Sequence, residues 1–357
     1  MLARRKKLQA ADTAKALTLS STTSHAASRL LEDYLPASVS IDKLIIPESA
    51  LDFGPESECI AHGGGGRVYR CQVANASNDL VVGQTVALKE VYSMLARTHS
   101  RDTVKEFGKE MAALLQVRHK HIVKFYGVFM QLESERSAQL DRFFLVMEFA
   151  ANGSMAEHVI LDLESEDSPS VERRHQWLIE VAEAVEYLHS QRYVHRDLKP
   201  QNVLLDAEWR CLLTDFGISR EMGQEGMTSQ QSPLTKSMGT LQFMPPEALN
   251  GIGATRHAPT FALATAWDAY SFALLCVATF KCSLVPFPDT EDRIVVAQMA
   301  ATNLRPELPT DVLGPDYIAL IQDMWNSDFA SRPAFSTIVS RLKQLKPLQV
   351  GRDTMDP

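Results

Sequence analysis

Residues 195–202 read His-Arg-Asp-Leu-Lys-Pro-Gln-Asn, and residues 215–217 read Asp-Phe-Gly. The first stretch supplies a carboxylate at Asp197, a lysine at Lys199 and an amide at Asn202, and the second adds a carboxylate at Asp215. Phosphoryl transfer needs a group that orients the attacking hydroxyl, a cation for the phosphate and oxygen ligands for a metal. The two stretches together therefore indicate phosphoryl transfer.

A run of four glycines, residues 63–66, lies upstream between two stretches with a strand-like pattern. Glycines let backbone N–H groups approach a phosphate closely, although a glycine run alone fits a flexible turn equally well. The sequence Val-Ala-Leu-Lys follows at 86–89, and its Lys89 is a second candidate for binding phosphate. The run and the lysine together predict a nucleotide site.

Apolar residues recur at spacings of three and four between residues 102 and 117, which predicts a helix. A flexible lysine needs an anion to orient it, and this helix offers Glu106 and Glu110. Glu110 is the preferred partner of Lys89, because it lies beside the apolar residues of the helix.

Two apolar stretches, 122–129 and 143–149, predict strands, so five strands and one helix form a small N-terminal part. Helical patterns dominate beyond residue 153, and one amphipathic helix ends just before residue 195. Residues 261–280 approach the length of a membrane span, but they include Asp268. A charge at the centre of a bilayer is costly, so a buried helix is the preferred interpretation.

These motifs resemble those of the eukaryotic protein kinases, and the resemblance covers nearly all of residues 50–345. It implies the two-lobed α+β protein kinase fold, with a small β-rich lobe at about 50–148 that carries one main helix. A larger, mostly helical lobe would span about 152–345, and residues 346–357 would form a short tail. ATP would bind in the cleft between the lobes, with Mg²⁺ or Mn²⁺.

The resemblance also implies roles for the motif residues. Asp197 is expected to act as the catalytic base or to orient the hydroxyl, and Lys199 to neutralise charge on the transferred phosphoryl group. Asn202 and Asp215 are expected to hold the metal, and His195 to pack structurally beneath the site. All of Lys89, Asp197, Asn202 and Asp215 are present, whereas loss of any one would have suggested an inactive pseudokinase.

The family pattern G-x-G-x-x-G-x-V, aligned on Val68, places Ala61 where the first glycine is usual. Gly65 stands where an aromatic residue is frequent, so we expect a more flexible loop and weaker nucleotide binding. Met147 is expected at the back of the pocket, with backbone groups of Glu148 and Ala150 against the adenine edge. The residues expected to surround ATP are Ala61, Gly63, Gly64, Gly66, Val68, Ala87, Lys89, Glu110, Met147, Glu148, Ala150 and Leu204.

Three further motif residues carry structural expectations from the resemblance. Glu247, in Pro-Pro-Glu where the family usually has Ala-Pro-Glu, is expected to form a buried ion pair with Arg332. Asp268, in the sequence WDAYSFA, is expected to brace the backbone of the segment at 195–197. The link between Glu247 and Asp268 is longer than usual in the family, and no role follows for it.

Lys199 and the pair at 239–240 favour serine/threonine specificity, and WDAYSFA and the segment at 119–129 resemble the tyrosine-kinase-like group. Two alternatives remain: a pseudokinase or scaffold that binds partners through this fold, and a small-molecule phosphotransferase of related fold.

Arg196 precedes the expected base, and in kinases such an arginine often receives an activation-segment phosphate. Thr235 and Ser237 are the leading phosphorylation candidates, unless their Ser/Thr-rich stretch is only a polar loop.

The formal net charge of −8 over 357 residues argues against non-specific nucleic-acid binding, which needs a basic face. The five cysteines form no CxxC pair, so free thiols in a reducing compartment are expected, and the predicted location is cytoplasmic. Residues 1–40 are basic and rich in Ser and Thr, which fits a disordered tail or, alternatively, a mitochondrial transit peptide. The expected partners are protein substrates, with activation by an upstream kinase or by autophosphorylation.

Overall fold

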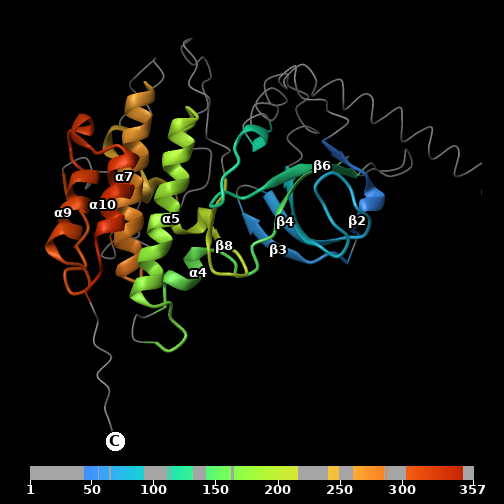
Figure 1. The fold of residues 1–357 in the computed structure, drawn as a ribbon, viewed down its shortest axis with the longest axis horizontal. Coiled ribbons are helices and arrows are strands. Elements are labelled where there is room, and N and C mark those ends of the chain that lie inside the picture. The colour runs from blue at the N-terminus through green and yellow to red at the C-terminus, as the bar shows by residue number, and fades with distance from the viewer. Residues whose placement is uncertain are drawn as a thin grey trace, which may run out of the picture. The chain divides into compact units, whose positions relative to one another are not determined.

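The computed structural model describes residues 44–54, 56–63, 66–91, 111, 114–131, 142–161, 165–215, 240–248, 260–284, 287 and 303–348. They fall into two compact units (Figure 1). The first unit comprises residues 1–60, 67–115 and 125–147, and the second comprises residues 61–66, 116–124 and 148–357. The predicted N-terminal tail and most of the predicted C-terminal tail lie outside the described residues.

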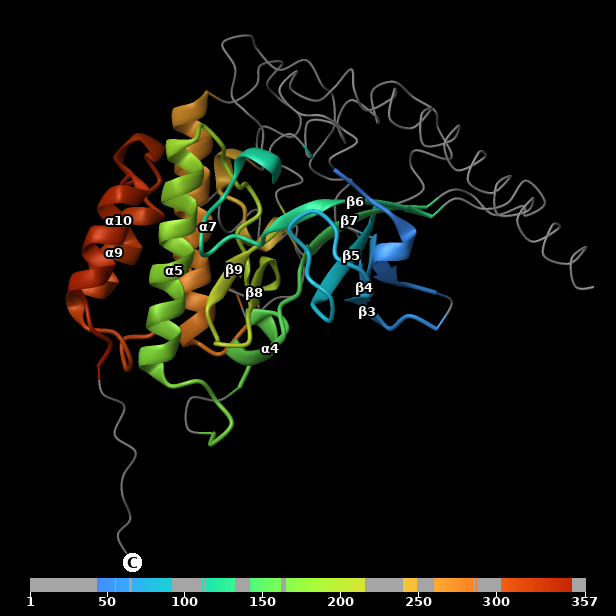
Figure 2. The same ribbon diagram turned by 45° about the vertical axis from the view of Figure 1, so that its right-hand side comes forward.

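The first unit is built on a curled, seven-stranded sheet (Figure 2). Its strands are β1 (Ile45–Ile46), β2 (Leu51–Asp52), β3 (Cys59–Gly63), β4 (Gly66–Val73), β5 (Thr85–Val91), β6 (Phe125–Gln131) and β7 (Arg142–Glu148). The order is β1-β6-β7-β5-β4-β2, and β3 also pairs with β4. The sequence pattern did not predict β1 and β2, which flank the short 3₁₀ helix η2 (Glu48–Ala50) and lie at opposite ends of this order.

The core of the first unit lies on one face of its sheet. Alternate residues of β4, β5 and β7 supply it, and Phe53, which follows β2, packs edge-on against Phe144 with ring centroids 5.0 Å apart. A Cβ at Gly127 would collide with the Leu44 carbonyl oxygen, which accepts a hydrogen bond from Val128 N at 2.8 Å. The N-terminal segment therefore lies directly on the sheet, and only glycine fits beneath it at residue 127.

The second unit is mostly helical and carries a two-stranded ladder of β8 (Val203–Leu205) and β9 (Cys211–Leu213). Its helices are α4 (Met155–Val159), α5 (Val171–Ser190), α7 (Phe261–Phe280), α9 (Pro315–Met324) and α10 (Phe335–Gln344), with 3₁₀ turns η3 (Pro200–Asn202), η6 (Thr240–Phe243) and η7 (Phe329–Ser331). Helix α5 packs against α7 and α10, and α7 packs against α9 (Figure 1). A β-rich unit and a helical unit confirm the predicted α+β fold.

Helix α7 is long and apolar enough to cross a membrane by length and composition alone. In the structure, 67% of its most apolar window is buried inside the protein. Asp268 in the middle of this helix is also fully buried, where it accepts hydrogen bonds from other segments of the second unit. These contacts confirm the prediction of a buried core helix.

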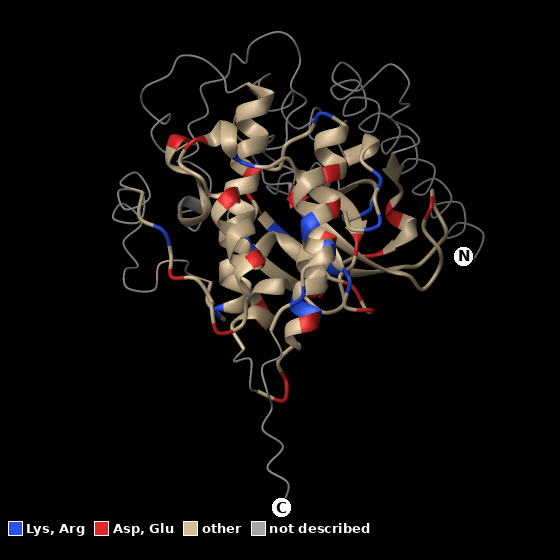
Figure 3. Ribbon diagram, turned by 60° about the vertical axis from the view of Figure 1, so that its left-hand side comes forward, with Lys and Arg blue, Asp and Glu red and all other residues tan. Residues whose placement is uncertain are grey.

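The remaining composition-based expectations concern thiols and charge. All five cysteines are free, as the absence of CxxC pairs predicted. Figure 3 shows Lys and Arg interspersed with Asp and Glu over the helices. The expected absence of a nucleic-acid partner stays a prediction.

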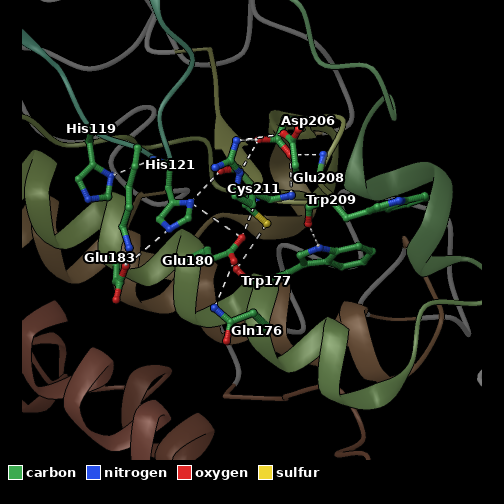
Figure 4. A network of polar contacts seen from close by, with 12 residues as sticks. His119, His121, Gln176, Trp177, Glu180, Glu183, Asp206, Glu208, Trp209 and Cys211 are labelled. Carbon is green, nitrogen blue, oxygen red and sulfur yellow. Dashed lines mark hydrogen bonds and ion pairs between the residues drawn. The ribbon is translucent and has the colours of Figure 1, made fainter.

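A polar network joins the segment at 116–124 to α5 and β9 within the second unit (Figure 4). The His121 ring lies with Nδ1 at 3.1 Å from the Cys211 carbonyl oxygen, and Glu180 accepts a 2.8 Å hydrogen bond from Cys211 N. Lys120 pairs with Glu183 at 3.0 Å. The segment that follows the predicted N-terminal helix is thus fixed to the helical unit.

Acidification is expected to destabilise the fold, because burial lowers the pKa of His119, His121 and His175 below the ordinary value of 6.5. The unfolded chain then binds more protons than the folded chain, so the free energy of unfolding falls as the pH drops below about 6.5. Glu183, whose pKa is about 2, still contributes fully at pH 5.5, because its unfolded value is 4.5. Urea unfolding at pH 7.5 and pH 5.5 tests this, and equal stability at both values would contradict it.

Candidate active site

The segment that carries the catalytic motif begins where α5 ends and runs into η3. Ser170 caps the start of α5 by accepting a hydrogen bond from Arg173 N at 3.2 Å, and the helix ends at Ser190. Arg196 has φ of 64°, a left-handed conformation that is rare for a residue with a side chain. The surrounding structure must therefore hold this backbone in place.

Asp268 of α7 is the residue that holds it. Its carboxylate accepts hydrogen bonds from His195 N at 2.8 Å and from Arg196 N at 2.7 Å, and His189 Nε2 lies 2.8 Å from the same group. Complete burial would raise the pKa of Asp268, but the hydrogen bond and charge of His189 and the charge of His195 hold it below its usual value. The predicted bracing of residues 195–196 by Asp268 is confirmed.

Lys199 and Asn202 both donate hydrogen bonds to the same carboxylate oxygen of Asp197. Lys199 Nζ lies 2.8 Å and Asn202 Nδ2 lies 2.9 Å from Asp197 Oδ2. Asp197 Oδ1 is buried and has no hydrogen-bond partner among the described residues. One oxygen of the carboxylate is therefore fixed by a cation and an amide, while the other remains as an acceptor.

His195 is fully buried, and both of its ring nitrogens are engaged. Nδ1 accepts from Asp197 N at 3.2 Å, so Nε2 carries the proton and donates to the Thr214 carbonyl at 2.9 Å. The ring links the catalytic segment to the residue before Asp215. This position confirms the prediction that His195 packs structurally beneath the site.

The β8–β9 ladder brings the two predicted metal ligands to the same end of two antiparallel strands. Asn202 directly precedes β8, Asp215 is the second residue after β9, and Thr214 N donates to the Asn202 carbonyl at 3.0 Å. Asn202 Nδ2 also donates to the Asp197 carbonyl at 2.8 Å, so its Oδ1 is the amide atom suited to a metal. An amide oxygen and a carboxylate are hard ligands that fit Mg²⁺.

In the first unit, several predicted nucleotide-binding residues share one face of the sheet. Val68 of β4 is paired with Lys89 of β5, and Arg70 with Ala87, so Val68, Ala87 and Lys89 project to the same side. Val146 of β7 points into the core on the opposite face of the sheet. Successive side chains of a strand point to opposite faces, so Met147 lies on the same face as Val68, Ala87 and Lys89.

Residues 152–154 pair with β8 within the second unit, which places Leu204 next to the residues that follow the predicted adenine-binding segment. Leu204 forms an isolated bridge with Ser154, and Leu205 N donates to the Gly153 carbonyl at 2.9 Å. Glu148 N donates to the Lys124 carbonyl at 2.8 Å, and the Ala150 carbonyl accepts from Gly153 N at 3.4 Å.

The structure describes the backbone of Ala61 and Gly63 in β3 and of Gly66 at the start of β4. Gly64, Glu110, Thr235 and Ser237 lie outside the described residues, so their predicted roles stay predictions.

The predicted pair of Glu247 and Arg332 is present in the second unit. Arg332 donates to both carboxylate oxygens of Glu247, at 2.5 and 3.1 Å, and its side chain is completely buried. It also donates to the Ala266 carbonyl at 3.0 Å and lies over the Tyr270 ring. The pair therefore ties the segment after η6 to α7, as predicted.

Comparison with known proteins identifies the family of the chain. The family model described as protein tyrosine and serine/threonine kinase matches residues 56–342. The chain therefore belongs to the protein kinase family. Its relatives support a kinase domain of the serine/threonine type that resembles the tyrosine-kinase-like group.

Three relatives show the range of the similarity. The chain is 29% identical to "Stress-activated protein kinase alpha" of Dictyostelium discoideum, over 84% of this chain and 42% of that protein. It is 29% identical to "Serine/threonine-protein kinase TNNI3K" of Rattus norvegicus, over 80% of this chain and 30% of that protein. It is 30% identical to "Serine/threonine-protein kinase mos" of Patiria pectinifera, over 73% and 69%. The chain thus spans less than half the length of the first two.

Proposed function

We propose that the protein is a catalytically active serine/threonine kinase that transfers the γ-phosphate of ATP to hydroxyls of protein substrates. The proposal rests on the different environments of the two carboxylate oxygens of Asp197. Its Oδ2 is held by Lys199 and Asn202, and its buried Oδ1 has no hydrogen-bond partner among the described residues. An acceptor oriented in this way suits the proton of an attacking hydroxyl.

The side chains of the catalytic motif have separate roles in the proposed phosphotransfer. Asp197 Oδ1 accepts the hydrogen of the substrate hydroxyl and aims its oxygen at phosphorus. Lys199, held 2.8 Å from Asp197 Oδ2, balances negative charge that develops on the transferred phosphoryl group. Asn202 Oδ1 and the Asp215 carboxylate would hold Mg²⁺, which supplies positive charge for the phosphate oxygens when it is bound.

We propose the nucleotide contacts from the resemblance to the protein kinases. Lys89 binds the α- and β-phosphates, while Val68, Ala87 and Leu204 enclose the purine and Met147 limits the depth of the pocket. Because Glu148 N already donates to Lys124, the carbonyl is the backbone group of Glu148 that can accept from adenine. Ala61, Gly63, Gly64 and Gly66 form the loop over the phosphates, and Glu110 orients Lys89.

Serine/threonine specificity is supported by Lys199 in the catalytic motif and by the names of the relatives. A pseudokinase that only binds partners is the second candidate, because Ala61 and Gly65 depart from the usual nucleotide loop. Turnover of ATP separates the two. Transfer to sugar or aminoglycoside acceptors, in place of protein, would favour a small-molecule phosphotransferase.

Labelled ATP and a peptide library test the function directly, and we expect label on serine and threonine. Lys89→Met and Asp215→Ala are each expected to reduce transfer by at least about 10²-fold, because both residues act on charge that electrostatic catalysis requires. Chelation of divalent cations is expected to abolish transfer in the unmutated protein. Transfer that persists in either folded variant, or after chelation, would refute the assigned roles.

We also propose that phosphorylation of Thr235 or Ser237 activates the enzyme through Arg196. A phosphate adds nearly two negative charges and three acceptor oxygens that a guanidinium can bind. Phosphatase treatment and the double variant Thr235→Ala/Ser237→Ala are expected to lower activity, with phosphosites mapped by mass spectrometry. Full activity of the dephosphorylated enzyme would remove this mechanism.

A further inference from the structure

Trp209, in the turn between β8 and β9, is held by rings from two helices. Its ring stacks on that of Trp177 of α5, with centroids 6.5 Å apart and 20° between the planes (Figure 4). His158 of α4 meets the same ring edge-on at 4.9 Å, and Trp177 Nε1 donates to the Trp209 carbonyl at 2.8 Å. Both the backbone and the ring of Trp209 are therefore fixed in place.

The backbone and the exposure of Trp209 are unusual for a tryptophan. Its φ is 63°, in the left-handed region where glycine costs least and a bulky residue is strained. Trp177 is fully buried, whereas Trp209 is 37% exposed. Packing on Trp177 thus accounts only for the buried side of the Trp209 ring. A rigid, partly exposed tryptophan is the type of residue that anchors protein–protein contacts.

The segments around Trp209 carry more acidic than basic side chains. Ile160, two residues after His158, adds a second apolar side chain that is 51% exposed. Of the two exposed arginines, Arg173 and Arg210, the latter already pairs with Asp206 and Glu208. The exposed carboxylates of α4, of its connection to α5, of the first turn of α5 and of the β8–β9 turn are Glu157, Glu166, Asp167, Glu172 and Glu208. We call these five residues, Trp209 and Ile160 the Trp209 surface.

We propose that the Trp209 surface is a docking site for a basic segment of a partner protein, in which an arginine stacks on the Trp209 ring and neighbouring basic residues pair with the carboxylates. A guanidinium is planar and is attracted to the face of an indole ring. The excess of negative charge favours a basic occupant over an acidic one and speeds its association. That the partner is also a substrate rests on the proposed phosphotransfer, whereas docking itself can be measured without ATP.

A fluorescent peptide of alternating arginine and leucine is the probe, and the same peptide with glutamate in place of arginine is its counterpart. We expect the full chain to bind the basic peptide but not the acidic one, with an affinity that falls as ionic strength rises. Trp209→Gly is expected to weaken binding at least about tenfold, because it removes the anchor ring while glycine accepts the left-handed backbone. When the basic peptide is joined to a serine-containing peptide, KM for the product should rise in this variant by a similar factor, with kcat and KM for ATP unchanged.

Phe329→Ala is the matched control, because Phe329 of η7 is exposed to a similar extent, 42%. Arg332, which follows η7, donates to the carbonyl of Ala266 near the start of α7. Arg174, which donates to the end of α4, bonds Thr279 near the opposite end of α7. Phe329 therefore lies away from the Trp209 surface, and its replacement should leave peptide binding unchanged.

A charge-reversal variant tests the surface without changing Trp209. Glu166 and Asp167 are exposed in the connection between α4 and α5, so Glu166→Lys/Asp167→Lys should fold normally. We expect it to weaken binding of the basic peptide at least about threefold at low ionic strength. This variant decides the matter if Trp209→Gly does not fold.

Four results would overturn the proposal: no binding of the basic peptide; equal binding of the basic and acidic peptides; unchanged affinity in Trp209→Gly, or in the charge-reversal variant if Trp209→Gly does not fold; or the same loss in Phe329→Ala. A dimer of the unmutated protein that dissociates in Trp209→Gly during sedimentation would assign the surface to a second copy of the chain instead. Absence of phosphotransfer in the unmutated protein would refute the proposed function, and peptide binding would still decide whether the Trp209 surface is a docking site.

Discussion

Replacing Asp197 with asparagine is expected to lower the rate of phosphotransfer by about 10²- to 10⁴-fold while the fold stays intact. Asparagine has nearly the same shape, and its side-chain oxygen can still accept from Lys199 or Asn202, which contact Oδ2 in the structure. It cannot take up a proton from an attacking hydroxyl, because an amide is a far weaker base than a carboxylate. The loss should therefore appear in kcat rather than in stability.

Asp206→Asn is the matched control for this prediction. Asp206 is also a buried carboxylate with a cationic neighbour, since Arg210 Nε donates to it at 2.8 Å. Its other oxygen accepts from the backbone of Glu208 and Arg210 in the turn between β8 and β9. We expect this variant to lose about 1 kcal/mol of stability and to keep its kcat. Near-normal turnover in folded Asp197→Asn would contradict the role assigned to Asp197.

The sequence predicted those parts of the site whose residues lie in short, chemically specific strings. Asp197, Lys199 and Asn202 belong to one stretch of eight residues, so their proximity follows from local chain geometry. The long-range contacts of Asp268 with residues 195–196, and of Glu247 with Arg332, were predicted from the family resemblance. Periodicity alone could not have given them, because it says which face of a helix is buried but not which residue it meets.

Contacts that use backbone atoms or very short strands left no signal in the sequence. Strand β1 has two residues, Ile45 and Ile46, and pairs with Val128 and Phe129 far along the chain. A pair of isoleucines shows no alternation from which a strand could be predicted. The contact between His189 and Asp268 was also missed, because a histidine near the end of an amphipathic helix resembles an ordinary surface residue.

Arg174 is the strongest example of a residue whose sequence context misleads. It lies next to Arg173 in a run of charged residues at the start of α5, yet its side chain is fully buried. Its guanidinium donates to the carbonyls of Leu161 and Thr279, each at 2.7 Å, and to Ser168 Oγ at 2.8 Å. Further carbonyls of His158, Val159 and Pro169 accept from the same group.

The position of these carbonyls explains why we expect Arg174 to stabilise the fold. His158 and Val159 are the last residues of α4, and Thr279 lies in the last turn of α7. Carbonyls at helix C-termini have no partners within the helix and carry partial negative charge, which a buried guanidinium satisfies. The Arg174 side chain thus caps α4 and α7 and holds the segment that precedes α5.

Arg174→Met is expected to lower the free energy of unfolding by at least about 3 kcal/mol, because several buried carbonyls would lose their donor at once. Arg174→Lys, which keeps the charge but has fewer donors, should fall between this variant and the unmutated protein. The exposed neighbour supplies the control, since Arg173→Met should change stability by no more than about 0.5 kcal/mol. Chemical unfolding of the set would measure the differences. Equal midpoints for Arg174→Met and Arg173→Met would show that the buried guanidinium does not hold α4, α5 and α7 together.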